Sequence, residues 1–306
     1  MNNSAVHDRE SHADPPVLPL VWRLGLITAG TLLIWVGVIQ LTTALWGPET
    51  SLQQHVTNAV GVGVPAVAMV LIFRRHVDRR PVSTLGLHTG KRAVRDFLYG
   101  ALTWLIPATL GLTAALLFGW VEISINSSIV ELIGVVLLLI VLVFVYEAFP
   151  EELIFRGYIY RNLTATVSPL ISVLIQALLF CAFGTALSGI IDGWGASLFL
   201  ERSSVFFVMG IVIGCLRVMS GSLWAGMGFH VAFQVATQLV LGSNYADITV
   251  SDEAVFTLAT GGLAFLAATS VAGRLWRRRA NWSKPEPEVN RATEHLLAGG
   301  SADSKQ

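Results

Sequence analysis

The stretch that decides the fold is VLVFVYEAFPEELIFRGYIYRNL, residues 141–163. It starts as an apolar run and then carries Glu147, Glu151, Glu152 and Arg156 within one short segment. At about 100° per residue, the first two acids share one stripe of a helix, and Glu152 and Arg156 share the next. Ionisable groups inside a membrane-spanning helix cost about 2.5–3.5 kcal/mol each on insertion scales, so this cluster indicates a functional site.

The spacing within this cluster suggests separate tasks. Glu152 and Arg156 stand at i,i+4, so we expect them to form an ion pair that leaves Glu151 available as a base or a metal ligand. Pro150 removes one helical hydrogen bond and is expected to kink the helix just before the pair. The alternative interpretation is a helix end whose charges face water at the membrane boundary.

The composition places the chain in a membrane. Of its 306 residues, 54% are apolar and only 13% are charged, against about 25% charged in an ordinary soluble domain. This balance excludes a disordered chain and a nucleic-acid binder, and it argues against a soluble globular enzyme. The two cysteines lie inside apolar runs and cannot form a disulfide framework.

The apolar runs predict an all-α polytopic membrane protein with about eight transmembrane helices, because spanning the hydrocarbon core takes roughly 20 residues. Polar tails are expected over 1–19 and 277–306, around a helical domain at 20–276 whose motif region is about 133–243. The runs lie near 20–46, 57–73, 97–121, 133–149, 169–190, 204–219, 222–243 and 254–276.

Basic residues collect on one side of this topology. With a cytoplasmic N-terminus, Arg202 is the one exception among the 20 Lys and Arg, and the loops after the first, third and seventh runs contain neither residue. Cytoplasmic loops gather Lys and Arg, so the pattern predicts that both termini are cytoplasmic. Arg23, Arg217 and Arg274 lie near span ends, and we expect them to extend toward the membrane interface.

A second polar site lies in the seventh run, GSLWAGMGFHVAFQVATQL. His230 is the only histidine in the eight runs, and the others, His55 among them, are assigned to loops and tails. Gln234 stands one turn further along the same helix face. An alternative is that these two side chains only bond a neighbouring helix, which Gly226 and Gly228 would allow to approach closely.

These motifs resemble those of a known family. Glu151-Glu152-Leu-Ile-Phe-Arg156-Gly157 is similar to the EExxxR motif of the CPBP family, also called the CAAX-protease, bacteriocin-processing or Abi family. The block from Ser220 through Trp224 to His230 and Gln234 resembles the later HxxxN block of that family, and Ser83–Leu87 its short LGL segment. The resemblance covers roughly residues 145–240.

The resemblance implies a CAAX-protease-like helical bundle and an intramembrane metalloprotease that cleaves a prenylated CAAX tail or another peptide. In that picture Glu151 activates water, while Glu152, Arg156, His230 and Gln234 complete the catalytic group. Glu151, Glu152 and His230 would ligate a divalent metal, for which zinc is the expected ion. Peptide hydrolysis needs a polarised water, a base and an oxyanion partner, and a metal with a carboxylate can supply the first two.

The sequence departs from the family pattern at two positions. The histidine of the FxxxH motif falls on Gly184 or Leu187, depending on register, and neither binds metal. The final Asn of the HxxxN block is Gln234, which keeps the amide on a longer arm. Thr185 or Cys181 is a candidate to replace the missing histidine.

Three functions remain open at this point. The first is an intramembrane metallo-endopeptidase acting on a peptide or protein substrate near the cytoplasmic membrane face. The second is a catalytically inactive relative that serves as a membrane partner or regulator, and the third, ranked last, is a small transporter. Besides substrate, the lipid bilayer is the expected partner and nucleic acid is not. The expected location is the plasma (cell) membrane if the protein is bacterial.

The expected depth of the two motifs places the site. Glu151 lies at the cytoplasmic end of the fourth run, and His230 lies about nine residues into the seventh, or roughly 13 Å deep. Both are expected to face one water-accessible cavity near the cytoplasmic end.

The topology is tested by cysteine labelling in intact cells. Cysteines introduced at Ser127 and Ser243 should react with an impermeant reagent from outside, and a cysteine at Ser301 should react only after lysis, because the basic loops stay inside. The natural cysteines are first replaced. Labelling of the Ser301 position in intact cells would contradict this topology.

Overall fold

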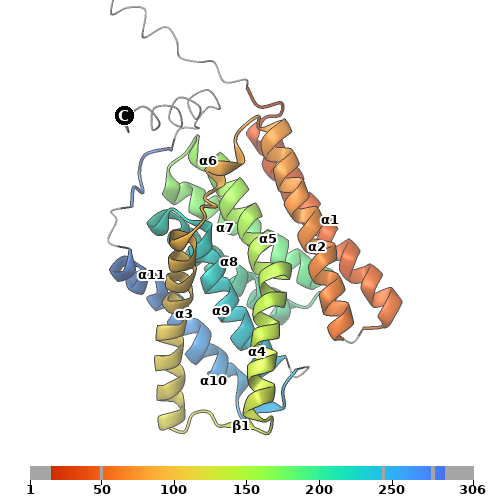
Figure 1. Ribbon diagram of the computed structural model, residues 1–306, viewed down its shortest axis with the longest axis vertical. Coiled ribbons are helices and arrows are strands. Elements are labelled where there is room, and N and C mark those ends of the chain that lie inside the picture. The colour runs from red at the N-terminus through yellow and green to blue at the C-terminus, as the bar shows by residue number, and fades with distance from the viewer. Residues whose placement is uncertain (1–14, 49–50, 243–244, 277–279, 287–306) are drawn as a thin grey trace, which may run out of the picture.

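The computed structural model describes residues 15–48, 51–242, 245–276 and 280–286, and almost all regular structure in them is helical (Figure 1). The predictions for the two tails fall mainly outside these residues. The elements, in chain order, are α1 Leu20–Trp46, α2 Leu52–Ile72, η1 Phe73–Val77, η2 Val82–Leu85, α3 Lys91–Leu117, β1 Ile123–Ile125, α4 Ile129–Val143, η3 Phe144–Ala148, α5 Phe149–Glu151, η4 Glu152–Ile159, α6 Tyr160–Thr164, α7 Pro169–Ile191, α8 Ala196–Ser220, α9 Leu223–Leu241, β2 Ile248–Val250, α10 Glu253–Thr257, η5 Leu258–Gly262 and α11 Leu263–Leu275.

The prediction of an all-α polytopic membrane protein is confirmed. Within the described residues, 7 helices are long and apolar enough to span a membrane. The seventh expected span, 222–243, is helix α9, which is present but is not among those seven helices. This helix carries the polar residues His230, Gln234 and Gln238.

Several helices are longer than the apolar runs from which they were predicted. The second span covers Leu52–Val77, and the fourth continues past residue 149 as Ile129–Thr164. Serines begin many of them, as their side chains accept a hydrogen bond from a free backbone N–H of the first turn. Ser128 does so for Glu131, and Ser168 for Ile171 just before Pro169 at the first helical position.

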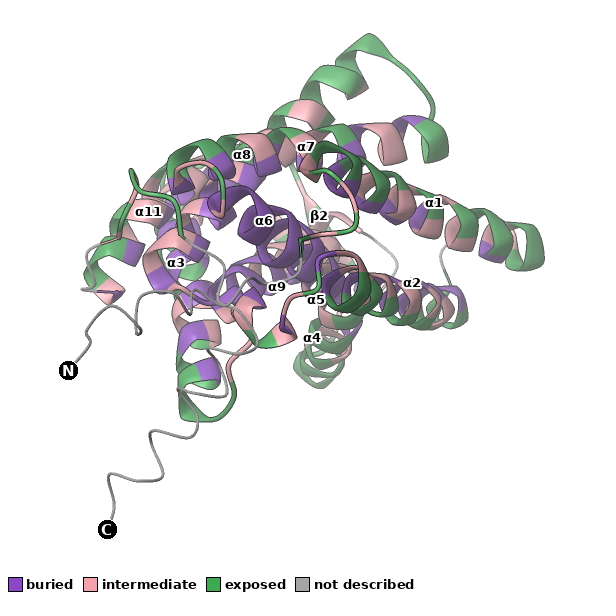
Figure 2. Ribbon diagram, turned by 90° about the horizontal axis from the view of Figure 1, so that it is seen from above, coloured by how far each residue is buried: buried purple, intermediate pink, exposed green. Residues whose placement is uncertain are grey.

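Helices α3 and α9 form a central pair in which the backbones touch. At Gly100 an added Cβ would overlap the Ala225 carbonyl, and at Gly228 it would overlap the Phe97 carbonyl. The sequence-based expectation that small residues of α9 admit a neighbouring helix is therefore confirmed. Figure 2 shows the buried residues of α6 and α9 in the middle of the bundle, with α1, α2 and α11 toward its outside.

Two elements mark the ends of the bundle. Strands β1 and β2 pair antiparallel, with Ile123 opposite Val250, and we call the end of the bundle where they lie the β1–β2 end. Helix α6 lies toward the other end, which we call the α6 end (Figure 1).

The corner between α8 and α9 turns at Gly221, whose φ of 70° is left-handed and suits glycine.

The first span is anchored by a buried network around Asp78. Arg23 Nη1 lies 2.7 Å from Asp78 Oδ1, and Arg74 Nη1 lies 3.2 Å from Asp78 Oδ2. Tyr158 and Asn162 from the fourth span donate hydrogen bonds to the same carboxylate at 2.8 and 3.0 Å. The network therefore joins α1, η1 and the end of the fourth span.

The expectation that Arg23 and Arg217 extend to the interface is wrong. Both are buried, each 8% exposed. Arg23 is held by Asp78, whereas Arg217 donates from Nε to the Arg156 carbonyl and stacks over Tyr160. A guanidinium with several internal acceptors has no need to reach water, because its charge is already compensated.

Breaking the Asp78 network should destabilise the bundle. Arg74→Ala removes one of two buried cations from Asp78, and losing one member of a buried pair costs roughly 3–5 kcal/mol. We expect a clearly lower thermal unfolding temperature in detergent. Arg75→Ala is the matched control, because Arg75 is the adjacent residue and is exposed. Equal unfolding temperatures for both variants would contradict a stabilising role for the network.

Candidate active site

Two π-helical turns shape the helix that carries the acids. η3 covers Phe144–Ala148 and η4 covers Glu152–Ile159, with the short α5 between them. Pro150 has no N–H to donate, so an unbroken α-helical ladder cannot pass through it. The chain widens into π turns on either side of the proline, which changes the faces that the acids occupy. The helix runs on through Pro150 to Thr164.

Glu152 and Arg156 form the ion pair expected from their spacing. Arg156 Nη1 lies 3.1 Å from Glu152 Oε1, and both residues are 0% exposed. The guanidinium also stacks on Phe180, with its carbon 4.3 Å from the ring centre, and contacts the Met209 carbonyl at 3.5 Å. The charge is therefore compensated by groups from three helices.

His230 joins both acids of the motif. Its Nδ1 lies 3.3 Å from Glu152 Oε1, and its Nε2 lies 4.0 Å from Glu151 Oε2. Residues 78 positions apart in the sequence therefore meet at one centre, as the two motifs predicted. Glu151 is 7% exposed and His230 is 1% exposed, so the centre is buried. The expectation that both side chains face a water-accessible cavity stays a prediction.

Gly226 makes room for the Glu152 carboxylate. A Cβ at Gly226 would lie 2.6 Å from Glu152 Oε2 and 2.7 Å from the Ile213 side chain. This oxygen is buried and has no hydrogen-bond partner among the described residues. Any side chain at Gly226 would push Glu152 away from His230.

Gln234 lies one turn beyond His230 and binds a different acid. Its amide Nε2 donates to Glu147 Oε2, and Gln238 Nε2 donates to Glu147 Oε1 at 2.8 Å. Two amides of α9 therefore hold the Glu147 carboxylate. Sequence reasoning did not identify Gln238, although its i,i+4 spacing from Gln234 placed both amides on one helix face.

The place of the missing family histidine is filled. At Gly184 an added Cβ would overlap the ring of Phe206 from α8, so no larger side chain fits there unless that ring moves. Neither proposed replacement reaches the acids through a hydrogen bond in the described structure. Thr185 Oγ1 lies 3.1 Å from Ser203 Oγ, and Cys181 Sγ contacts the Ser203 carbonyl at 3.3 Å.

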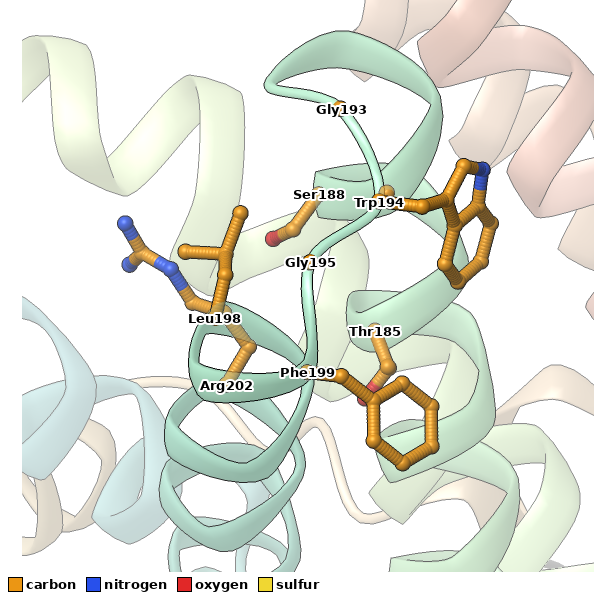
Figure 3. A pocket seen from close by; sticks show the side chains of 9 residues that line it. Thr185, Ser188, Gly193, Trp194, Gly195, Leu198, Phe199 and Arg202 are labelled. Atoms are coloured by element: carbon orange, nitrogen blue, oxygen red, sulfur yellow. The ribbon is translucent and has the colours of Figure 1, made fainter.

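Thr185 also lines a small cavity at the turn between α7 and α8. Figure 3 shows it with Trp194, Phe199 and Arg202 around this cavity. The ring of Trp194 packs against Gly189, where an added Cβ would lie 2.5 Å away. None of the site residues expected from the two motifs lines this cavity.

The donor set does not fit a three-ligand metal site. Catalytic zinc usually takes three protein ligands at about 2 Å. Glu152 contacts Arg156 and the Nδ1 side of His230, so only Glu151 and His230 Nε2 face one another. Among the described residues, no group of three His, Cys, Asp or Glu is arranged to hold a metal ion. We therefore derive no chemical step through a metal.

The fold and the site define a polytopic helical membrane protein with two glutamates and a histidine at a buried centre. Residues 133–236 match the family described as type II CAAX prenyl endopeptidase Rce1-like. This match confirms the resemblance to CAAX proteases drawn from the motifs. The match contains the glutamate motif, His230 and Gln234. No curated protein matches the chain significantly.

Arg156 is expected to stabilise the fold rather than to take part in proton transfer, because a guanidinium does not deprotonate in proteins. Arg156→Ala leaves Glu152 buried without its cation, at a cost of roughly 3–5 kcal/mol. The amount of folded protein in the membrane and its unfolding temperature should both fall. Arg202→Ala, at an exposed position of α8, is the control. Normal stability of Arg156→Ala with loss of activity alone would refute this role.

Proposed function

We propose that the chain is an intramembrane endopeptidase of the CAAX-protease type, acting on a peptide or protein substrate. The observation that carries the proposal is the approach of His230 Nε2 to 4.0 Å from Glu151 Oε2. A polar separation of this size is one that a single water can bridge. The Rce1-like match over 133–236 supports peptide hydrolysis as the reaction.

In the proposed reaction, one water donates its two hydrogens to Glu151 and His230 Nε2. Its oxygen lone pairs then face the scissile carbonyl carbon. Glu151 takes the proton as the C–O bond forms, and returns it to the leaving amine as the C–N bond breaks. In this arrangement the Nδ1–H of His230 donates a hydrogen bond to Glu152 Oε1, 3.3 Å away. This bond fixes the orientation of the ring and leaves Nε2 as an acceptor.

The proposal also states where the substrate binds. His230 is seven residues from the start of α9, or roughly 10 Å, so substrate is proposed to bind near the α6 end. With the basic loops inside, that end is the cytoplasmic face of the plasma membrane.

That the protein binds zinc stays a prediction. Metal content per purified chain and cleavage after chelation test it, and full cleavage by metal-free protein would exclude a requirement.

Glu151→Gln tests the catalytic assignment. Glutamine keeps the shape of the side chain and loses the base, so cleavage of a prenylated CAAX reporter should fall about 10²–10⁴-fold while folding is kept. His230→Ala should also abolish cleavage. Glu131→Gln is the matched control, since Glu131 is an exposed acid of α4 in the same span.

A non-catalytic relative is the second candidate, favoured by the Phe206 ring at Gly184 and by the binding of Gln234 to Glu147. Its test uses the same variants. Full biological function with Glu151→Gln and His230→Ala would overturn the peptidase proposal and support a partner or regulator. Loss of function in both of these variants, with intact folding and an active Glu131→Gln, would exclude the non-catalytic relative.

A further inference from the structure

A polar cavity of about 390 Å³ lies at the α6 end of the bundle. It is enclosed by the turn after η2, by α6, by the last turn of α8 and by the chain that follows α11. None of the residues assigned to the Glu151–His230 centre lines it, and its volume is within the range of ordinary small-ligand pockets. Its lining residues include Gly86, Tyr160, Arg217, Asn281 and Glu286.

The guanidinium of Arg217 forms part of the cavity wall. It packs on Gly86, where an added Cβ would lie 2.8 Å from Nη2 and 3.0 Å from Cζ, and both residues line the cavity. The Nε of Arg217 donates to the Arg156 carbonyl at 3.3 Å, so the guanidinium is held in one orientation. The cavity therefore offers a charged donor whose position is set before a ligand arrives.

The Tyr160 hydroxyl is a second donor at this wall. Tyr160 lies beside the guanidinium, whose carbon is 5.5 Å from the ring centre. The hydroxyl forms no hydrogen bond within the described residues. It is also not one of their enclosed polar atoms that lack a partner, so it keeps access to the cavity. A guanidinium and a neighbouring hydroxyl are donors suited to an oxyanion.

The C-terminal side of the cavity is formed by residues 280–286, which we call the strap and which rise beside α6 (Figure 1). The Glu286 N–H donates to the Thr164 carbonyl at 2.7 Å. The Leu170 N–H donates to the Trp282 carbonyl at 3.3 Å, and Arg161 donates to the Glu286 carbonyl at 2.9 Å. All three bonds use backbone groups of the strap, so they do not occupy the Glu286 carboxylate.

The charges of the cavity come from two residues. Arg217 is the one cation and Glu286 the one acid among the residues that line it. Arg217 is buried, whereas Glu286 is exposed, so the carboxylate lies where the cavity meets solvent. The chain thus closes a cationic cavity with a carboxylate of its own, and attraction between the two charges favours the position of the strap seen here.

We propose that this cavity is a binding site for a carboxylate from outside the chain, which replaces Glu286 and releases the strap. The ligand carboxylate would accept hydrogen bonds from the Arg217 guanidinium and the Tyr160 hydroxyl. Because one guanidinium balances one carboxylate, the external ligand and Glu286 compete for it. A cation would be repelled by Arg217, and a neutral amide would form weaker hydrogen bonds than a carboxylate. The existence of this site does not depend on peptidase activity.

A mimic of residue 286 tests the proposal in the full-length protein in detergent. The probe is N-acetylglutamate N-methylamide, and the matched control is N-acetylglutamine N-methylamide, in which an amide replaces the carboxylate. The natural cysteines are replaced, and a nitroxide attached after Ser283→Cys reports the mobility of the strap. The glutamate probe should bind saturably by calorimetry and raise the mobility of the label, and the glutamine probe should do neither.

Three variants assign the binding groups. Arg217→Gln should weaken binding of the glutamate probe about tenfold or more, because a hydrogen bond between charged groups is lost, and Tyr160→Phe should weaken it several-fold. Glu286→Gln should raise the mobility of the label without probe and should tighten probe binding, because the competing carboxylate is gone. Glu201→Gln is the matched control, since Glu201 is an exposed acid of α8 that does not line the cavity.

Absence of binding, or equal binding of the two probes, would overturn the proposal, as would an affinity unchanged in both Arg217→Gln and Tyr160→Phe. Saturable binding that leaves the label as immobile as before would also overturn it, because the strap would not be displaced. If Arg217→Gln fails to fold, Tyr160→Phe and Glu286→Gln decide the outcome. Glu151→Gln should bind the probe as the natural protein does, so failure of this site and failure of the peptidase proposal are distinguishable.

Discussion

A buried guanidinium must be neutralised inside the bundle, and the rest of the structure depends on how Arg156 is neutralised. Glu152 supplies the counter-charge, and the same carboxylate contacts His230. Phe180 and the Met209 carbonyl complete the shell around the cation. One carboxylate therefore both stabilises the fold and orients the imidazole, which explains why the fold and the centre cannot be altered independently at this position.

The parts of the fold that rest on local rules were predictable from the sequence. Apolar length identified the helices, because spanning a bilayer sets a minimum run. The Glu152–Arg156 pair followed from i,i+4 spacing, which two residues on one helix determine by themselves. The meeting of Glu151 with His230 was also predicted, since polar groups of separate spans find each other where no water is available.

The remaining features depend on contacts between distant parts of the chain, which no local pattern encodes. Arg23 was expected at the interface, but Asp78, just after the second span, holds it inside. His55 was assigned to a loop because the apolar run began after it, yet α2 begins at Leu52 and buries it. The partner of Gln234 depended on the rotation of α9 against η3, which the π turn before Pro150 alters.

The glycine contacts between α3 and α9 also limit how the centre can open. With backbones touching at Gly100 and Gly228, α9 cannot rotate or slide on α3 without steric overlap. His230 lies on α9, so these contacts fix its position relative to α3. Helices α1 and α2 lie side by side at one side of the bundle (Figure 1). This pair is tied to the fourth span by the Asp78 network, so a route for substrate past either pair has to break buried contacts.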